Sequence, residues 1–214
     1  EIPLRLVGSE MCIRDSYKPM EIGDRLLVVP EWLREDPKVR AGLAAGRVAL
    51  VLDPGLTFGT GSHATTRLCL TTLEKTIRGG ERVLDLGCGS GILSIAALKL
   101  GAVSAAAVDI DNKCRGVAYE NAALNGIGQD TYTVRIGDVL GDAVLRADLG
   151  GGWQMVVANI VADVIIGLSP LVRPMLAPGG LFLCSGIIDD RAQEVADRLR
   201  ENGWEILETR SAEG

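Results

Sequence analysis

From about Val48 onward, short apolar runs rich in β-branched residues alternate with longer segments that have helical spacing. The apolar runs that predict strands are VALVL, RVLDL, AAAVDI, YTVRI, WQMVVANI, LFLCSG and WEILET. The segments that predict helices are ATTRLCLTTLEKTI, GILSIAALKL, NKCRGVAYENAALN, VIIGLSPLVRPML and DDRAQEVADRLREN. Strands that alternate with helices pair in parallel, because each helix carries the chain back across the sheet. The pattern therefore predicts an α/β fold with a mostly parallel, twisted sheet and helices on both faces.

Local signals define the ends of several helices. Asp111 is placed to cap the helix that follows the strand AAAVDI. Glycines stand where left-handed caps end helices, at Gly101, Gly126 and Gly203. We expect the strands near 82–86 and 105–109 to be adjacent and parallel, with the strand at 154–159 on the other side of the first. A ligand cleft then opens at the carboxyl ends of these strands, where the strand order reverses.

Composition and charge narrow the classes of function. The 214 residues are 47% hydrophobic and 23% charged, which is enough for one sizeable core. The net charge of -6 disfavours direct binding of nucleic-acid phosphates and favours a basic partner. The longest apolar stretch, residues 92–108, is interrupted by Lys99 and Gly101 and is shorter than the roughly 20 residues that a bilayer requires. We expect neither a membrane span nor a secretory signal.

The five cysteines, one of them Cys12, are far apart in the sequence and form no CxxC pair, and His63 is the single histidine. This spacing predicts neither a zinc site nor a disulfide framework. Reduced thiols fit a cytoplasmic protein best, so we expect no metal and a cytoplasmic location.

A glycine-rich turn, VLDLGCGSGILS, joins a predicted strand to a predicted helix at residues 83–94. Glycines at 87, 89 and 91 leave backbone N–H groups accessible and allow a ligand to approach without a Cβ in the way. A dinucleotide fingerprint needs Gly or Ala at position 92, which is Ile92 here. The turn therefore favours a ligand other than a pyrophosphate.

Acidic residues flank this turn. Asp85 followed by alternating glycines resembles motif I of the S-adenosylmethionine-dependent methyltransferases. That cofactor has no phosphate but carries an ammonium, with which a carboxylate can pair; the alternative is that Asp85 bonds only local backbone groups. Asp109 ends the next strand, where its carboxylate can accept the ribose hydroxyls, or simply cap a helix. A dinucleotide site also uses an acid at that position, so Asp109 does not discriminate between the cofactors.

A second dense stretch, LDPGLTFGTGSHATTRLCL, makes the resemblance more specific. Together with the glycine turn, VDIDNKCRGVAYENAALNG, VVANIVAD and LAPGGLFLCSGI, it is similar to the ribosomal protein L11 methyltransferase (PrmA) family over residues 17–210. The resemblance implies a Rossmann-like class I methyltransferase fold. It also implies S-adenosyl-L-methionine as cofactor and a large-subunit ribosomal protein as partner, N-methylated on lysine side chains or on its N-terminal amine.

Carried over residue by residue, the family's cofactor contacts fall on Thr66, Gly87, Asp109 and Asn159, and we add Gly89 of the same turn. No catalytic residue is assigned. Two positions depart from the family pattern: Ala64, where Pro is frequent, and the VAD that follows Asn159-Ile160, where Leu-Ala is usual.

The residues themselves leave alternatives at two of these positions, Thr66 and Asn159. Thr66 lies in the first turn of a helix, so its hydroxyl faces either the cofactor or its own backbone. Asn159 ends a wholly apolar strand, where an unpaired buried amide is costly, so its partner is a ligand or an internal hydrogen bond. For His63 we expect a role in ordering the loop rather than in catalysis.

The ends of the chain and the rival functions complete these expectations. Residues 1–16 resemble a translated sequencing adapter and are treated as a foreign or disordered segment, residues 17–47 as a linker region, and residues 48–214 as the methyltransferase domain. We expect the family's N-terminal substrate-recognition domain and the final strand to be absent, which exposes residues 204–209 and slows methylation more than cofactor binding. The rivals are a small-molecule methyltransferase, a nicotinamide-dependent oxidoreductase and a cofactor-binding protein without catalysis.

Overall fold

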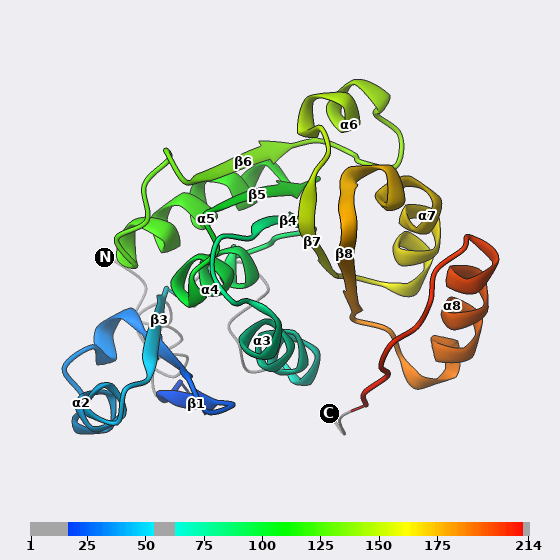
Figure 1. The fold of residues 1–214 in the computed structure, drawn as a ribbon. Coiled ribbons are helices and arrows are strands. Elements are labelled where there is room, and N and C mark those ends of the chain that lie inside the picture. Colours follow the sequence, from blue (N-terminus) through cyan, green and yellow to red (C-terminus); the bar gives the residue numbers. More distant parts are fainter. Residues whose placement is uncertain (1–16, 54–62, 212–214) are drawn as a thin grey trace, which may run out of the picture.

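A five-stranded parallel sheet forms the centre of the molecule (Figure 1). The computed structural model describes residues 17–53 and 63–211. The sheet has the order β6-β5-β4-β7-β8. Its strands are β4 (Arg82–Leu86), β5 (Ser104–Asp109), β6 (Tyr132–Ile136), β7 (Trp153–Asn159) and β8 (Leu176–Ser185). The expected placement of β5 and β7 on the two sides of β4 is confirmed.

Helices cover both faces of this sheet, as expected (Figure 1). One face carries α3 (Ala64–Thr76), α4 (Ile92–Leu100) and α5 (Asn112–Leu124). The other carries α6 (Ala143–Leu149), α7 (Ala162–Val172) and α8 (Asp189–Glu201). Each crossover from one parallel strand to the next therefore adds a helix to one of two layers, which is how a chain of this pattern buries both faces of its sheet.

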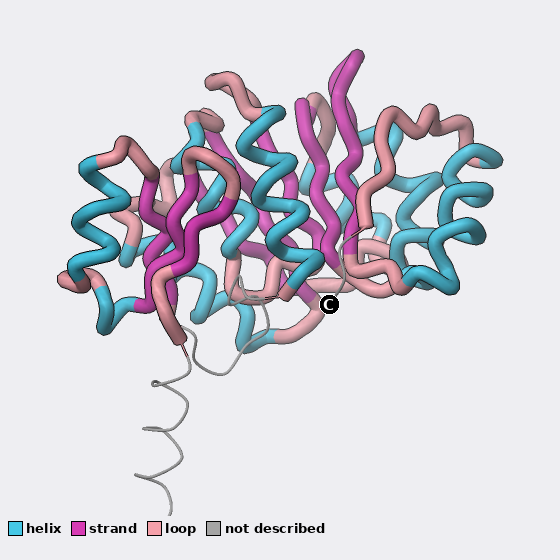
Figure 2. The backbone as a smooth tube through the Cα atoms, turned by 90° about the horizontal axis from the view of Figure 1, so that it is seen from below, coloured by secondary structure: helices cyan, strands magenta, loops and turns pink. Residues whose placement is uncertain are grey.

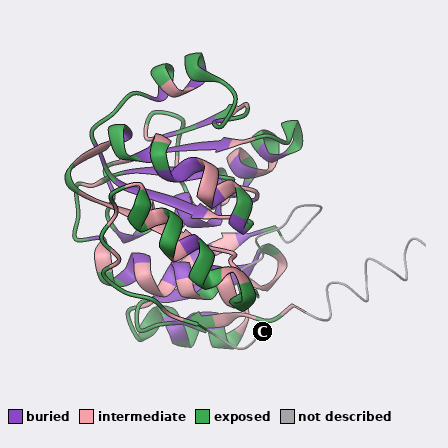
Figure 3. Cartoon of the chain, turned by 90° about the vertical axis from the view of Figure 1, so that its right-hand side faces the viewer, coloured by how far each residue is buried: buried purple, intermediate pink, exposed green. Residues whose placement is uncertain are grey.

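Successive residues of the central strands pack into two different cores. Val83 of β4 and Val157 of β7 lie in the core beneath α3 and α4, whereas Leu84 and Val156 lie in the core beneath α7. Because both faces are buried, these strands read as continuous apolar runs rather than as alternating ones. Figure 3 shows the buried strands between helices whose outer faces are exposed.

The predicted helix caps are confirmed. The side chain of Asp111 accepts a hydrogen bond from the backbone N–H of Lys113 at 2.9 Å. Gly101, Gly126 and Gly203 have φ of 116°, 72° and 79°, in the left-handed region that glycine adopts without a steric cost.

A small three-stranded sheet stands beside the main one (Figure 2). It contains β1 (Met20–Ile22), β2 (Leu26–Pro30) and β3 (Val48–Leu52), and it is accompanied by the 3-10 helix η1 (Glu31–Leu33) and by α2 (Pro37–Ala44). The expectation that the run VALVL belongs to the main parallel sheet is wrong, because β3 pairs in parallel with β2 instead. The apolar pattern identified a strand but not its partner. The domain boundary that we placed at residue 48 stays a prediction.

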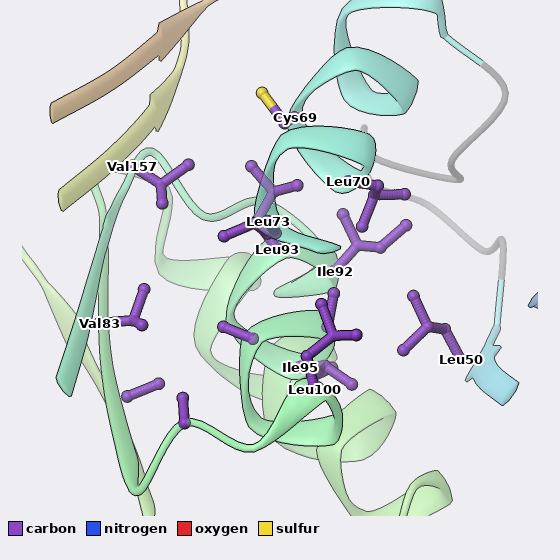
Figure 4. Packing of buried hydrophobic residues seen from close by; sticks show 14 of the residues in the cluster. Leu50, Cys69, Leu70, Leu73, Val83, Ile92, Leu93, Ile95, Leu100 and Val157 are labelled. Atoms are coloured by element: carbon purple, nitrogen blue, oxygen red, sulfur yellow. The ribbon is translucent and has the colours of Figure 1, made fainter. Parts of the chain in front are cut away.

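The small sheet is held against α3 by a buried carboxylate. Glu74 accepts the backbone N–H groups of Asp24 and Arg25, in the turn between β1 and β2, at 2.9 and 3.1 Å. On the same side, Leu50 of β3 packs into the core with residues of α3 and α4 such as Leu70 and Ile92 (Figure 4). Residues 1–16 lie outside the described residues, so the expectation of a foreign or disordered segment is not addressed.

The run WEILET does not form a strand, which corrects the prediction for residues 204–209. The side chain of Trp204 anchors this segment instead. Its indole N–H donates to the carbonyl of Ser169 at 2.8 Å, and its ring packs against Phe182 with centroids 5.3 Å apart. Leu207 is 72% exposed. A strand needs a hydrogen-bonded neighbour, and the described chain supplies none here.

Within residues 17–53 and 63–211, no helix is long and apolar enough to cross a bilayer. In the same ranges, no three His, Cys, Asp or Glu side chains form a group able to hold a metal ion. The thiols described there are free: Cys69, Cys88, Cys114 and Cys184.

Candidate functional site

Polar side chains converge at the carboxyl ends of the parallel strands. The glycine turn follows β4, Asp109 ends β5 and Asn159 ends β7. Asn159 is aligned with Ser185 at the end of β8, and the first turn of α3 brings Thr66 to the same edge. Gly87 and Asn159 therefore lie on adjacent strands, at the position where ligands bind in open parallel sheets.

The glycines of the turn are required by the backbone and by packing. Gly87, Gly89 and Gly91 have φ of 77°, 51° and 79°, which side chains other than hydrogen rarely allow. A Cβ on Gly87 would overlap the side chain of Ile160, and one on Gly91 would lie 2.8 Å from the hydroxyl of Tyr132. The turn is thus closely packed on its protein side.

The hydrogen bonding of the turn's backbone N–H groups differs from the expectation. We expected them to be accessible, but they donate inside the protein: Gly87 and Cys88 to the carbonyl of Val108 at 2.8 and 3.1 Å, Gly89 to Oδ2 of Asp109 at 2.9 Å, and Gly91 to the carbonyl of Cys88 at 2.8 Å. A phosphate site needs such donors free to point at the anion. This turn therefore suits a ligand that carries no phosphate.

Asp109 supports the turn from the neighbouring strand. Its Oδ2 accepts from Gly89, and its Oδ1 accepts from the backbone N–H of Asp111 at 2.9 Å. Asp111, not Asp109, caps α5. Each carboxylate oxygen can accept a second hydrogen bond, and Asp109 is partly exposed, so it can still bind a hydroxyl from solvent or from a ligand.

Asn159 and Thr66 are 93 residues apart in the sequence and form a hydrogen bond. The side-chain Nδ2 of Asn159 donates to Oγ1 of Thr66 at 3.2 Å, whereas its Oδ1 is buried without any hydrogen-bond partner. An unpaired buried oxygen costs about 1–3 kcal/mol, and the cost is removed when a ligand supplies a donor. Both alternatives therefore apply to this amide: its Nδ2 makes the internal hydrogen bond, and its Oδ1 is left for a ligand.

His63 caps α3, while the hydroxyl oxygen of Thr66 accepts from Asn159. The Nδ1 of His63 lies 2.7 Å from Oγ1 and 3.4 Å from the backbone nitrogen of Thr65. This contact fits the expected role in ordering the loop. The glycines of GTGS, and the preceding PGLTF, lie outside the described residues.

Asp85 is buried directly beneath the turn. Its Oδ2 accepts from the hydroxyl of Ser94 at 2.7 Å and from the backbone N–H of the same residue at 3.2 Å, while its Oδ1 has no partner. Burial raises the pKa of this carboxyl to about 6, against the lowering effect of the bonds from Ser94. The local contact that we considered for Asp85 thus exists, and one oxygen is left over.

Ser185 was not recognised from the sequence. Its hydroxyl donates to the carbonyl of Thr65 at 3.3 Å, and its own carbonyl accepts from the N–H of Ile160 at 3.0 Å. These bonds join the ends of β7 and β8 to the start of α3. A polar residue at the carboxyl end of an apolar run was the available signal, but its partner lies 120 residues away.

Comparisons with known proteins agree on one family. The family model described as ribosomal protein L11 methyltransferase (PrmA) matches residues 10–214. Proteins named ribosomal protein L11 methyltransferase are similar in Desulforamulus reducens (44% identical, covering 89% of this chain and 58% of that protein) and in Caldanaerobacter subterraneus (45%, 86% and 55%). A solved ribosomal protein L11 methylase from Lactobacillus delbrueckii is 34% identical with a TM-score of 0.80, covering 92% of this chain and 94% of that one. The chain therefore spans less than two thirds of the length of these curated relatives.

Proposed function

Because the chain belongs to the ribosomal protein L11 methyltransferase (PrmA) family and has its Rossmann-like class I fold, we propose that it binds S-adenosyl-L-methionine and N-methylates ribosomal protein L11. The acceptors are lysine side chains, with the N-terminal amine as a second candidate. A net charge of -6 suits a basic protein substrate. The cytoplasm is the compartment in which that substrate and reduced thiols are found.

The observation that carries the proposal is the unpaired, buried Oδ1 of Asn159 at the strand edge beside the glycine turn. The residues present fit the cofactor. Its ammonium and ribose hydroxyls are donors, for which Asn159 and Asp109 supply acceptors, and Thr66 holds the amide of Asn159 in place. Gly89 lets the ligand approach the backbone, whereas at Gly87 the missing Cβ makes room for Ile160 and keeps the turn close to the strand edge. The amides of Gly87, Cys88, Gly89 and Gly91 are already paired, as a ligand without phosphate permits. When bound, the cofactor supplies a methyl group on a positively charged sulfur.

Because that methyl group is already activated, the chain's residues need to align donor and acceptor and keep water out rather than supply a strong base. A lysine amine must be neutral to attack, and its ordinary pKa is about 10.4. Desolvation in the cleft lowers that pKa. An amide oxygen can accept two hydrogen bonds. In the proposed mechanism the Oδ1 of Asn159 accepts one from the cofactor and one from the acceptor amine, and so orients the lone pair of the amine toward the methyl group.

The direct experiment is mass spectrometry of ribosomal proteins after incubation with the chain and S-adenosylmethionine. The expected result is methylation of L11 and of no other ribosomal protein. In a parallel incubation of the chain with a cell extract and S-adenosylmethionine labelled on its methyl group, label that enters soluble metabolites instead of L11 would identify a small-molecule methyltransferase. Binding of S-adenosylhomocysteine without any transfer would identify a binding protein, and binding of NADH in its place would identify an oxidoreductase.

Asp109→Ala is expected to weaken cofactor binding by roughly tenfold or more. It removes a charged acceptor from the ribose, worth about 1.5–3 kcal/mol for each bond, and also the acceptor of the Gly89 amide. Calorimetric titration with S-adenosylhomocysteine measures the effect. The fold should survive, because Asp109 is partly exposed at the end of its strand. A loss of less than about threefold would mean that Asp109 does not face the ribose.

Asn159→Ala is expected to lower the methylation rate or cofactor affinity by about tenfold, because it removes the unpaired acceptor. Asn159→Asp is the matched control, because it keeps an oxygen at the position of Oδ1. Its second oxygen takes the place of Nδ2, which donates to the hydroxyl oxygen of Thr66, and can accept a hydrogen bond from that hydroxyl instead. Single-turnover rates and calorimetry are compared for both variants. If Asn159→Ala leaves rate and affinity unchanged, the role assigned to this amide is wrong.

A further inference from the structure

Two asparagines one helical turn apart, Asn121 in α5 and Asn125 at its C-cap, face the end of β3. The Oδ1 of Asn125 accepts from the backbone N–H of Val51 at 2.9 Å, and its Nδ2 donates to the carbonyl of the same residue at 2.7 Å. This side-chain amide thus pairs with the strand through both of its polar groups, as the backbone of a neighbouring strand would. Asn125 ties β3 to α5, two elements that lie side by side (Figure 1).

Asn121 makes a different pair of contacts. Its Oδ1 accepts from the backbone N–H of Asp53 at 2.9 Å, and its Nδ2 donates to the carbonyl of Ser90 at 2.9 Å. Ser90 lies inside the glycine turn. The side chain of Asn121 is fully buried, so both bonds are protected from water. Asn121 therefore connects the end of the small sheet directly to the backbone of the turn, which Asn125 does not touch.

The turn needs such a restraint. Gly87, Gly89 and Gly91 give it a permissive backbone, with three left-handed conformations in five residues. A flexible loop must lose conformational entropy when it binds a ligand, and a loop held beforehand loses less. A buried amide with donor and acceptor both paired fixes a direction as well as a distance.

We propose that Asn121 is a positioning residue for the cofactor: it fixes the carbonyl of Ser90, and so the shape of the glycine turn, relative to β3. Asn125 anchors the small sheet without acting on the turn. Through the two hydrogen bonds of Asn121, the end of the small sheet and the glycine turn are held in a fixed relative position. The test of this role by cofactor affinity rests on the proposed function, whereas the test by the rigidity of the turn does not.

The matched variants Asn121→Asp and Asn125→Asp test this role. Each change adds one negative charge, keeps the acceptor of a backbone N–H group (Asp53 or Val51) and loses the Nδ2 donor. That donor faces the carbonyl of Ser90 in the case of Asn121, and the carbonyls of Val51 and of Asn121 in the case of Asn125. Asn121→Asp should weaken binding of S-adenosylhomocysteine about tenfold, and Asn125→Asp by less than about threefold although it lowers the melting temperature. Equal losses of affinity in the two variants would overturn the proposal.

A second measurement does not need the cofactor. Amide hydrogen exchange of residues 87–91 in the free protein should be faster in Asn121→Asp than in Asn125→Asp, with exchange in β7 unchanged. If the unmodified chain does not bind S-adenosylhomocysteine, the proposed function fails, and exchange alone decides the role of Asn121. If Asn121→Asp does not fold, Asn121→Ser, which adds no charge, is compared in its place. If the amides of residues 87–91 exchange at the same rate in the Asn121 variant as in the Asn125 variant, the proposal is wrong.

Discussion

Replacing Gly87 with alanine is expected to lower the free energy of unfolding by about 2–5 kcal/mol and to reduce cofactor affinity by more than about tenfold. The left-handed conformation at φ of 77° costs an alanine about 1–2 kcal/mol. The new Cβ also overlaps the side chain of Ile160, and overpacking of this kind costs about 1–3 kcal/mol. The strain is relieved by displacing the side chain of Ile160, the turn or the segment that follows β7, and the last two position the candidate cofactor contacts.

Gly126→Ala separates these two costs. Gly126 has a similar φ of 72°, but a Cβ there meets nothing within 4 Å. It should therefore show the conformational cost of about 1–2 kcal/mol alone and leave cofactor affinity unchanged. Urea denaturation and calorimetry of the two variants give the comparison. Truncation of the obstacle in Gly87→Ala/Ile160→Ala should recover part of the lost affinity, and additive effects of the two changes would show that Ile160 is not the obstacle.

The second large effect is a change in the pH dependence of stability in Asp85→Asn. Burial raises the folded-state pKa of Asp85 from 3.8 to about 6, so the folded protein retains the proton over a range where the unfolded chain loses it. The stabilising contribution of the neutral carboxyl is complete below about pH 4 and is lost as the pH rises through about 6. About two pKa units correspond to roughly 3 kcal/mol.

The difference in unfolding free energy between Asp85→Asn and the unmodified protein isolates this contribution from those of the other carboxyls. It should move in favour of the asparagine variant by roughly 3 kcal/mol between pH 4 and pH 7, measured by urea denaturation at several pH values. In Ser94→Ala the upper end of this window should shift to higher pH, because the lost hydroxyl bond from Ser94 stabilises the charged carboxylate. A difference that does not vary with pH would mean that Asp85 is not held in a raised-pKa environment.

Some features of the candidate site follow from local sequence patterns, and others depend on contacts between distant parts of the chain. Asp109 and Asn159 were expected at the carboxyl edge because each polar residue ends an apolar run, and in a parallel sheet such ends gather on one side. The internal bonding of the turn amides was not predictable. It depends on Val108 and Asp109 of β5 lying next to β4, which is a property of the assembled sheet.

By itself the sequence predicted the strands and most of the helices of the main sheet, and the order β5-β4-β7 at its centre. Apolar runs long enough to be buried on both faces, joined by helices with glycine caps, allow few arrangements other than a parallel sheet with two helical layers. The glycine turn and its flanking acids marked the functional edge. These features are local, since each depends on the spacing of residues within about 20 positions, and the physical rules that relate spacing to conformation act at that range.

Only the tertiary structure decided which distant segments pair. The partner of β3, the anchoring of residues 204–209 through Trp204, and the bonds of Asn121, Asn125 and Ser185 all join residues that are at least 20 positions apart. Periodicity tells a strand or helix which face to bury but does not say against what. A buried amide or hydroxyl is determined by the groups that surround it, and those groups are brought together only when the whole chain has folded.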